Sequence, residues 1–376
     1  MLSEENINFL DYFSTLEDHR IDRKKLYPME EILLLTLCGV ICGCEGWADL
    51  EEFGKQKLKF LRRYRPFEYG TPSDDTLRRF FRSLDPEGFK RCFIEWVKNL
   101  QKTRPDIVSI DGKRLRRSYD KANDKPAIHM VSAFVSNARL VLGQEKVTDK
   151  SNEITAIPKL LDLLDISGAI VTIDAMGCQT KIAKKITDKE CDYVFGLKGN
   201  QGALREDVEL FFQTHKQSGF KKLAHDYCCD IDKGHGRFES RSCRITEDIA
   251  WLDSLDKWAG LRSIIMIESV RELGDLVESE TRYYISSLPA NAVAAAQAIR
   301  SHWGVENCLH WVLDVTFRED DNRIRNGNAP ENMAIMRHAV INMLQPHRSK
   351  KMTMKRLRKM AGWDDNVLER ILLTKF

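Results

Sequence analysis

Three acidic residues lie at positions where an isolated charge would be costly. Asp111 ends the apolar run IVSID, Asp174 ends the run AIVTID, and Glu306 lies in the tryptophan- and histidine-rich segment SHWGVENCLHW. A carboxylate at the end of a buried strand needs a partner, and a divalent metal ion is the usual one. Three carboxylates from three separate elements are the ligands that two-metal phosphoryl transfer requires. The residues therefore predict a metal-dependent, DNA-cutting enzyme in which Asp111 bridges two ions and Asp174 and Glu306 each hold one.

Other interpretations of the same residues stay open. The sequence IDG is also common in turns, so Asp111 and Asp174 could be turn formers at strand ends. His302, Glu306 and His310 are four residues apart and share one helix face, which would suit a zinc-dependent hydrolase, although the spacing is not that of metalloproteases. We expect instead that the two histidines flank the ion site and meet phosphate or a carboxylate. Four acids at or beyond the end of this helix compete with Glu306, namely Asp314, Glu319, Asp320 and Asp321.

The segment 105–201 has the pattern of an α/β fold. A strand at 107–113 is followed by a hairpin of two strands at 129–135 and 139–147 and by a helix at 153–164. A fourth strand at 169–174, a helix at 181–188 and a fifth strand at 193–197 complete the segment. This order matches a ribonuclease-H-like sheet, in which the first and fourth strands are neighbours. Neighbouring strands lie about 4.8 Å apart. Asp111 and Asp174 would therefore end adjacent strands and be close enough to share a metal ion.

The whole chain is predicted to be an α/β protein with a ribonuclease-H-like mixed sheet core and a partly β insertion, preceded by an all-helical N-terminal domain. The predicted stretches are helices 1–104, which we expect to bind DNA, core 105–201, insertion 202–288, core helices 289–346 and a basic helical tail 347–376. The insertion has an irregular pattern with strand-like alternation at 263–270 and 281–286. Helices are expected at 290–313 and 330–344, with Trp303 and Trp311 as packing anchors.

Basic residues cluster twice, which favours contact with a nucleic-acid backbone. Residues 55–82 contain nine lysines and arginines, and residues 348–359 contain seven. Six aromatic residues interleave with the first cluster and suggest some stacking on bases, namely Phe60, Tyr64, Phe67, Tyr69, Phe80 and Phe81. Each cluster could equally be a solvated helix face. The short helix that carries Arg78 and Arg79 resembles a recognition helix, Lys198 opens a turn that could hold a phosphate, and His235 and Arg237 form a basic turn.

Composition is that of an ordinary soluble chain of 376 residues with a formal net charge of +3. The N-terminus is acidic where a signal peptide would be basic, and the longest apolar run is too short to span a bilayer. We therefore expect a cytoplasmic, nucleoid-associated protein. Ten cysteines in such a protein do not indicate disulfides. Five residues could form a zinc cluster, although CC is not the CxxC spacing, namely His225, Cys228, Cys229, His235 and Cys243.

Several motifs together resemble the H-repeat-associated family of bacterial insertion-sequence transposases. They are IDGKRLRRSYD, SNEITAIPKLLDLLDI, DAMGCQ, LKGNQG, HGR, RYYIS and HWGVENCLHWVLDVTFREDDNRIRNGNAPEN, and the resemblance covers nearly the whole chain. It implies a DDE enzyme that cuts double-stranded DNA at the element's inverted repeats and joins the 3′-hydroxyl to target DNA with Mg²⁺ or Mn²⁺. The residues that match the family's acid triad are Asp111, Asp174 and Glu306.

The chain departs from wider relatives near the glutamate. Many of them carry arginine four residues before it and lysine seven after it, where this chain has His302 and Leu313. The residues expected to bind the scissile-strand phosphates are then His310, Arg318 or Lys198. Joining two element ends favours a homodimer on DNA. The alternatives are a metal-dependent nuclease without strand transfer and a catalytically silent, domesticated DNA-binding remnant.

Overall fold

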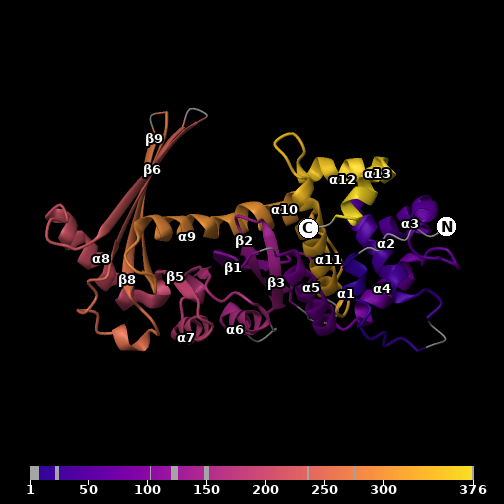
Figure 1. Cartoon of the computed structure of the whole chain (residues 1–376), viewed down its shortest axis with the longest axis horizontal. Helices are drawn as coiled ribbons and strands as arrows, with labels where there is room; N and C mark the ends of the chain where they lie inside the picture. The colour runs from indigo at the N-terminus through magenta and orange to yellow at the C-terminus, as the bar shows by residue number, and fades with distance from the viewer. Residues whose placement is uncertain are drawn as a thin grey trace. The chain divides into compact units, whose positions relative to one another are not determined.

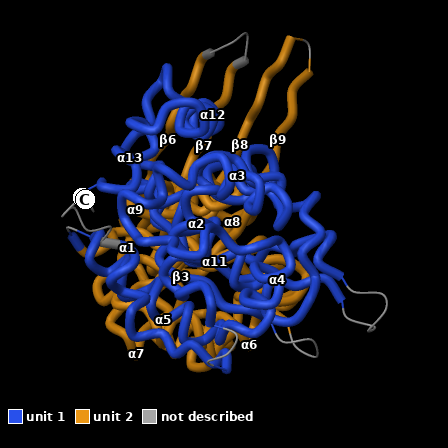
Figure 2. The backbone as a smooth tube through the Cα atoms, turned by 90° about the vertical axis from the view of Figure 1, so that its right-hand side faces the viewer, with its two compact units in different colours: residues 1–103, 112–150, 307–376 blue, residues 104–111, 151–306 orange. Residues whose placement is uncertain are grey.

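The computed structural model describes residues 8–21, 25–101, 103–119, 126–147, 152–234, 237–274 and 276–374. The chain divides into two compact units (Figure 2). Unit 1 comprises residues 1–103, 112–150 and 307–376, and unit 2 comprises residues 104–111 and 151–306. Both units are therefore built from segments that are far apart in the sequence. The five stretches expected from the sequence follow a different division and stay predictions.

The regular elements that the structure describes in the first hundred residues of unit 1 are all helices. The helices are α1 (Asn8–Tyr12), α2 (Met29–Cys42), α3 (Trp47–Leu61), α4 (Asp74–Ser83) and α5 (Pro86–Leu100). Their starts follow the capping signals in the sequence. The Ser73 hydroxyl accepts from the Thr76 backbone N–H at 3.4 Å, and the Asp85 carboxylate accepts from the N–H groups of Glu87 and Gly88. These bonds satisfy helix-end donors that would otherwise lack partners.

Helix α11 (Ala329–Leu344) is the central helix of unit 1 and is buried along its whole length. The predicted helix 330–344 is thus confirmed. Several of its buried polar side chains are paired, which offsets the cost of their burial. The Asn342 amide donates to the Val141 carbonyl and accepts from the Val141 N–H, each at 2.9 Å, which fixes α11 against strand β3. The Arg337 guanidinium lies 3.1 Å from the Glu319 carboxylate. The last helices of the unit are α12 (Met354–Trp363) and α13 (Asp365–Leu372).

We expect His338 on α11 to make folding sensitive to acid. Burial, reinforced by the nearby positive charge of Arg337, lowers the pKa of His338 from 6.5 to about 3. The folded state therefore keeps the imidazole neutral, while the unfolded chain protonates it below pH 6.5. Wild type should lose about 1.4 kcal/mol of unfolding free energy per pH unit between pH 6.5 and 3 from this group. His338→Leu should flatten that part of the pH profile in urea titrations.

The control for this prediction is His19→Leu, because His19 is exposed. That variant should keep the wild-type pH dependence. Equal slopes for wild type and His338→Leu below pH 6.5 would contradict the assignment of a depressed pKa to this histidine.

The sheet confirms the predicted mixed α/β architecture. Strand β1 (Ile107–Arg114) contributes to both units, because the first segment of unit 2 ends at Asp111 and the second segment of unit 1 begins at Gly112. In unit 1, β2 (His129–Val135) pairs with β3 (Leu140–Lys146) antiparallel. In unit 2, β4 (Ile170–Ile173) pairs in parallel with both β1 and β5 (Asp192–Gly196). The strand order is β3-β2-β1-β4-β5-β9-β8-β7-β6, so the first and fourth strands are neighbours, as predicted.

The insertion is more regular than its sequence indicates, and the prediction of an irregular stretch is corrected here. It begins with helix α8 (Gly202–Gln217), and four antiparallel strands then extend the sheet beyond β5. These strands are β6 (Asp226–Gly234), β7 (Arg237–Thr246), β8 (Ser263–Leu273) and β9 (Leu276–Ser286). The first two were missed because their sequences mix polar and apolar residues on both faces, which removes the period-two pattern.

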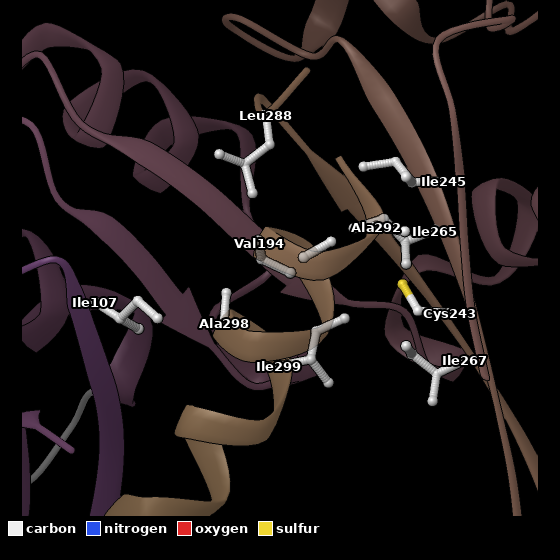
Figure 3. Packing of buried hydrophobic residues seen from close by; sticks show 11 residues of the cluster. Ile107, Val194, Cys243, Ile245, Ile265, Ile267, Leu288, Ala292, Ala298 and Ile299 are labelled. Atoms are coloured by element: carbon white, nitrogen blue, oxygen red, sulfur yellow. The ribbon is translucent and has the colours of Figure 1, made fainter. Parts of the chain in front are cut away.

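Helices of unit 2 connect and cover its strands. They are α6 (Glu153–Leu163), α7 (Thr180–Asp188) and α9 (Ala292–Gly304), and the six-residue π-helix Val305–His310 follows α9 directly (Figure 1). Small residues of α9 allow close approach to the sheet: Ala298 and Ile299 pack in one buried cluster with Ile107 of β1 and Val194 of β5 (Figure 3). This packing places the C-terminal part of α9 over β1.

No single helix in the described ranges is both long and apolar enough to cross a membrane. Only α2 and α3 taken together meet those criteria, and they are separated by a bend of 99°.

Candidate functional site

The two predicted aspartates follow paired residues on neighbouring strands of unit 2. The parallel register of β1 and β4 runs to the pair Ile110 and Ile173, so Asp111 and Asp174 come next on each strand. Both side chains are half-buried. Side chains two residues apart in a strand share a face of the sheet. Asp111 therefore lies on the face of Ser109, and Asp174 lies on the face of Thr172.

Helix α9 is hydrogen-bonded to that same face. The Thr172 hydroxyl donates to the Ser109 hydroxyl at 3.0 Å, and the Ser109 hydroxyl donates to the Ser301 carbonyl at 3.2 Å. The Thr172 oxygen also lies 3.2 Å from Nδ1 of His302. Polar residues inside two buried strands thus serve to hold the helix. Ser109 and Thr172 were not predicted as site residues, although the sequence has a hydroxyl two residues before each aspartate.

Glu306 lies further along the helix in the direction of the two aspartates. The helix and β1 run the same way, because Ala298 and Ile299 pack with Ile107 while Ser301 bonds to Ser109. From Thr172 to Asp174 a strand advances by about 6.6 Å. From His302 to Glu306 a helix advances by about 6 Å. Asp174 and Glu306 therefore lie at similar distances beyond the neighbouring residues Thr172 and His302, toward the same end of the sheet. Asp111 has the same position on β1 as Asp174 has after β4.

The backbone around Glu306 is unusual. Residues Val305–His310 form a π-helix, and Glu306 is exposed within it. Single π turns inside α-helices are rare and occur often at functional sites. The sequence predicts a continuous α-helix over 290–313, and the structure replaces its middle by this wider turn. The conformation favours Glu306 as a functional residue over an ordinary solvated acid.

A second loop holds the turn that follows Asp174. The Asp174 Oδ1 accepts hydrogen bonds from the N–H groups of Met176 and Gly177, at 3.0 and 3.4 Å. The loop after β5 then bonds to this turn, because the Asn200 amide donates to the Ala175 carbonyl at 2.5 Å and the Gln201 amide donates to the Cys178 carbonyl at 2.9 Å. Within the described residues, Oδ2 of Asp174 accepts no hydrogen bond. One carboxylate oxygen therefore orients the turn while the other is available to a ligand.

His302 lies near both Asp174 and Lys198. Burial lowers the pKa of His302, the negative charge of Asp174 opposes this shift, and the positive charge of Lys198 adds to it. Lys198 is exposed at the start of the loop that bonds to the Asp174 turn. A lysine and a histidine beside a strand-end carboxylate are suited to bind a phosphate group. Both residues were predicted as DNA contacts, and the structure places His302 close to Asp174 and to Lys198.

The acids that compete with Glu306 are engaged by cations of unit 1. Lys113 lies 2.7 Å from Asp314, 3.3 Å from Glu319 and 3.2 Å from Asp320, and Asp321 pairs with Arg318 at 3.4 Å. A carboxylate neutralised by an internal cation is a poor metal ligand. In the part of the chain that the structure describes, no three His, Cys, Asp or Glu side chains are grouped closely enough to hold a metal ion. The triad Asp111, Asp174 and Glu306 therefore stays a prediction.

Comparison with protein families decides the assignment of the chain. Residues 102–343 match the family model described as "Transposase DDE domain", and residues 10–97 match the one described as "DDE_Tnp_1-associated". The chain belongs to the transposase DDE domain family. The resemblance predicted from the sequence motifs is confirmed.

Curated relatives of this transposase-family chain include proteins of similar length. The "H repeat-associated putative transposase YhhI" of Escherichia coli (strain K12) is 42% identical over 371 residues, which cover 96% of this chain and 97% of the relative. The "Putative transposase YncI" of Escherichia coli O157:H7 is 41% identical over 371 residues, 97% of this chain and 94% of the relative. A solved piggyBac transposase synaptic complex with hairpin DNA aligns with a TM-score of 0.43 at 10% identity, over 99% of this chain and 79% of that one.

The remaining predicted DNA contacts of the transposase-family chain lie in several places. Arg78 and Arg79 are on α4 and pair with Asp74 and Asp75 of the same helix. Three others were predicted alongside them: His310 is half-buried in unit 1, His235 lies outside the described residues, and of Arg237 only the strand backbone is described. Arg318 has a left-handed backbone (φ 50°) and lies 3.5 Å from Glu45.

Two expectations about aromatic residues were wrong. Trp303 and Trp311 were predicted to be packing anchors, yet they are 40% and 57% exposed. The aromatic residues of the first basic cluster were expected to stack on bases, but five of the six are buried in the core of unit 1 and only Tyr69 is exposed. Helical periodicity shows which residues share a helix face, but it does not show whether that face is covered by other parts of the protein or open to solvent. Both errors have this cause.

The basic clusters are also partly used inside unit 1. Arg63 pairs with Glu369, and Arg65 pairs with Glu30. In the second cluster Arg358 is buried and donates to the carbonyl of Val40. These cations stabilise the fold, so fewer basic side chains are available for DNA than the sequence suggests.

The possible zinc cluster of the insertion is not supported by the strand geometry. Cys228 and Cys243 are directly opposite each other on β6 and β7. Cys229 follows Cys228 in the strand and so points to the other face of the sheet. The described cysteines and histidines of this region form no metal-binding group.

Proposed function

We propose that this chain is a DDE transposase that cuts double-stranded DNA at the ends of an insertion-sequence-like element and joins the 3′-hydroxyl to target DNA. One juxtaposition carries the proposal. Asp111 and Asp174 end neighbouring parallel strands, and the helix that leads to Glu306 is hydrogen-bonded to those same strands. The family match and the full-length relatives support the same function.

The donor set suits a hard divalent cation. Asp111, Asp174 and Glu306 offer only oxygen atoms, and Oδ2 of Asp174 accepts no hydrogen bond among the described residues. Mg²⁺ and Mn²⁺ prefer oxygen ligands, and zinc prefers nitrogen and sulfur. When bound, two such ions would activate the attacking oxygen and stabilise the leaving oxygen. Like charges on the three carboxylates repel one another, so the metal-free chain should keep them apart.

The chain's own residues would orient the DNA strand. Lys198 and His302, beside Asp174, would bind the phosphate next to the scissile bond. The hydrogen bonds of Asn200 and Gln201 would keep Lys198 at a constant position relative to Asp174. His310, Arg318 and Arg237 are proposed as further contacts along the DNA. A homodimer would bring two element ends together.

Helix α4 is proposed as part of the DNA-binding surface. The double substitution Arg78→Gln and Arg79→Gln should weaken binding to element-end DNA, because it removes two exposed cations that can exchange Asp74 and Asp75 for phosphates. The negative slope of log affinity against log salt concentration should become less steep, by up to about 0.9 for each phosphate that the protein no longer neutralises. Fluorescence anisotropy at several salt concentrations measures this slope.

Lys184→Gln is a suitable control for that experiment, since Lys184 is an exposed lysine of unit 2 that pairs with Asp188. An unchanged salt slope in the α4 double variant would remove this helix from the DNA surface.

The test of the function is cutting and joining of DNA that carries the inverted repeats flanking this gene. The wild-type protein should nick and join in Mg²⁺ or Mn²⁺, and chelation should abolish both reactions. Nicking without joining would instead show a metal-dependent nuclease. Specific binding without cutting in either metal would show a DNA-binding remnant, and one shorter relative is indeed named "Inactive transposase YbfQ".

A further inference from the structure

A partly buried ionic network in unit 1 surrounds Lys113. Its ammonium lies within 3.3 Å of three carboxylates, and the Lys113 side chain is only 9% exposed. Arg337 and Arg116 complete the network by pairing with Glu319 and Asp320, each at 3.1 Å. Three cations thus balance three carboxylates. Burial alone would lower the pKa of Lys113, but the surrounding carboxylates raise it, so the lysine stays charged.

Stability does not explain such a network well. Removing several charges from water is costly, and well-packed apolar residues of similar volume often stabilise a fold as much or more. Glu319 is 2% exposed and Arg337 is 5% exposed, so this cost applies fully to them. A buried ionic network does have another property, which is that it permits one arrangement of its members and penalises shifted ones.

The position of Lys113 in the chain indicates which two elements the network holds together. Lys113 is two residues beyond Asp111 on β1, so it shares the face of Asp111 and Ser109. Asp314 is in α10 (Trp311–Val315), which directly follows the π turn that contains Glu306. The network therefore joins the strand just after one proposed metal ligand to the helix just after another.

A second link holds the same two elements on the other side of the ligands. Within unit 2, the Ser109 hydroxyl donates to the Ser301 carbonyl. Along β1, Asp111 thus lies between Ser109 and Lys113. Along the helix, Glu306 lies between Ser301 and Asp314. Each ligand is bracketed by two links, a neutral one in unit 2 and an ionic one in unit 1.

We propose that Lys113 is a positioning residue: its ion pairs with Asp314, Glu319 and Asp320 keep β1 and the helix after Glu306 in register, so that Asp111 and Glu306 can bind metal together. This rests on the proposed function. Lys113 acts through the two ligands and need not touch DNA. Among the acids that follow Glu306, Asp314, Glu319 and Asp320 are thereby assigned to internal ion pairs.

The test compares Lys113→Gln, Lys113→Arg and the control Lys184→Gln by hydrogen exchange and by DNA cleavage. In Lys113→Gln, amide exchange should rise by about tenfold or more in residues 112–115 and 311–321, because local opening no longer has to break the network. Exchange in α2 should stay unchanged. Cleavage should fall through a lower maximal rate and a higher Mg²⁺ requirement, with unchanged DNA affinity. Lys113→Arg should recover part of both, and Lys184→Gln should behave as wild type.

Two results would overturn the proposal. One is equal acceleration of exchange throughout unit 1, including α2, which would show a merely structural role. The other is wild-type exchange and wild-type cleavage in Lys113→Gln. If the wild-type protein does not cut DNA at all, the proposed function fails, and the exchange data still decide whether Lys113 holds these two segments in register.

Discussion

Asp174→Asn should lower metal-dependent DNA cleavage by about 10³-fold, the scale on which removal of one preorganised electrostatic interaction acts. The substitution removes the charge that a divalent cation requires but preserves the shape of the side chain. Oδ1 of Asp174 accepts from two backbone N–H groups of the following turn, and an asparagine carbonyl can accept the same two bonds. The fold and the turn should therefore survive, and the measurement is cleavage of element-end DNA in Mg²⁺ and in Mn²⁺.

DNA affinity separates this prediction from simple unfolding. Asp174→Asn should bind element-end DNA at least as well as wild type, because it removes a negative charge from the neighbourhood of Lys198 and His302. Asp188→Asn is the matched control, since Asp188 is an exposed acid of unit 2 that pairs with Lys184. Parallel loss of cleavage and binding in Asp174→Asn would refute its role as a metal ligand.

The sequence was sufficient to predict the part of the site that rests on strands. The apolar runs before Asp111 and Asp174 are β-branched and end in a charge, and this local signal correctly indicated two buried strands. The rule that the first and fourth strands of this fold are neighbours then placed the two aspartates side by side. The register of β1 and β4 agrees, since Ile110 is opposite Ile173.

The helix that carries Glu306 was predictable in extent but not in detail. A π turn adds one residue to a helical turn without a distinctive sequence, so nothing in VENCLH announces it. The exposure of Trp303 and Trp311 was likewise hidden, because tryptophan is usually buried and no local pattern reports a missing neighbour. Only the folded chain shows that these residues face solvent.

The basic clusters were over-interpreted for a related reason. Their partners are distant in the sequence: Arg63 pairs with Glu369, and Lys57 pairs with Asp365, some three hundred residues away. Charge counted along a segment cannot reveal such pairs. The same holds for Lys113, whose partners begin at Asp314. Long-range ion pairs decide which charges a surface offers, and a single sequence does not contain that information in readable form.

Glu306→Gln should lower both cutting and joining by about 10³-fold, as expected when one charged group no longer acts on the reacting centre. Glu306 is exposed, and glutamine is nearly as good a helix former as glutamate, so the variant should fold normally. Asp321→Asn tests the competing assignment. Asp321 is half exposed, follows the same helix and was among the alternatives for the third ligand, yet it pairs with Arg117 and Arg318.

The two variants therefore test which acid is the third metal ligand. Loss of activity in Glu306→Gln with normal activity in Asp321→Asn would assign the third carboxylate to the π turn. The reverse result would move it to Asp321, whose ion pairs with Arg117 and Arg318 would have to open before metal could bind. The other three acids after the helix, Asp314, Glu319 and Asp320, surround the almost completely buried Lys113, so opening their ion pairs for a metal ion would be costly. This cost is the physical reason to expect Glu306 to be the ligand.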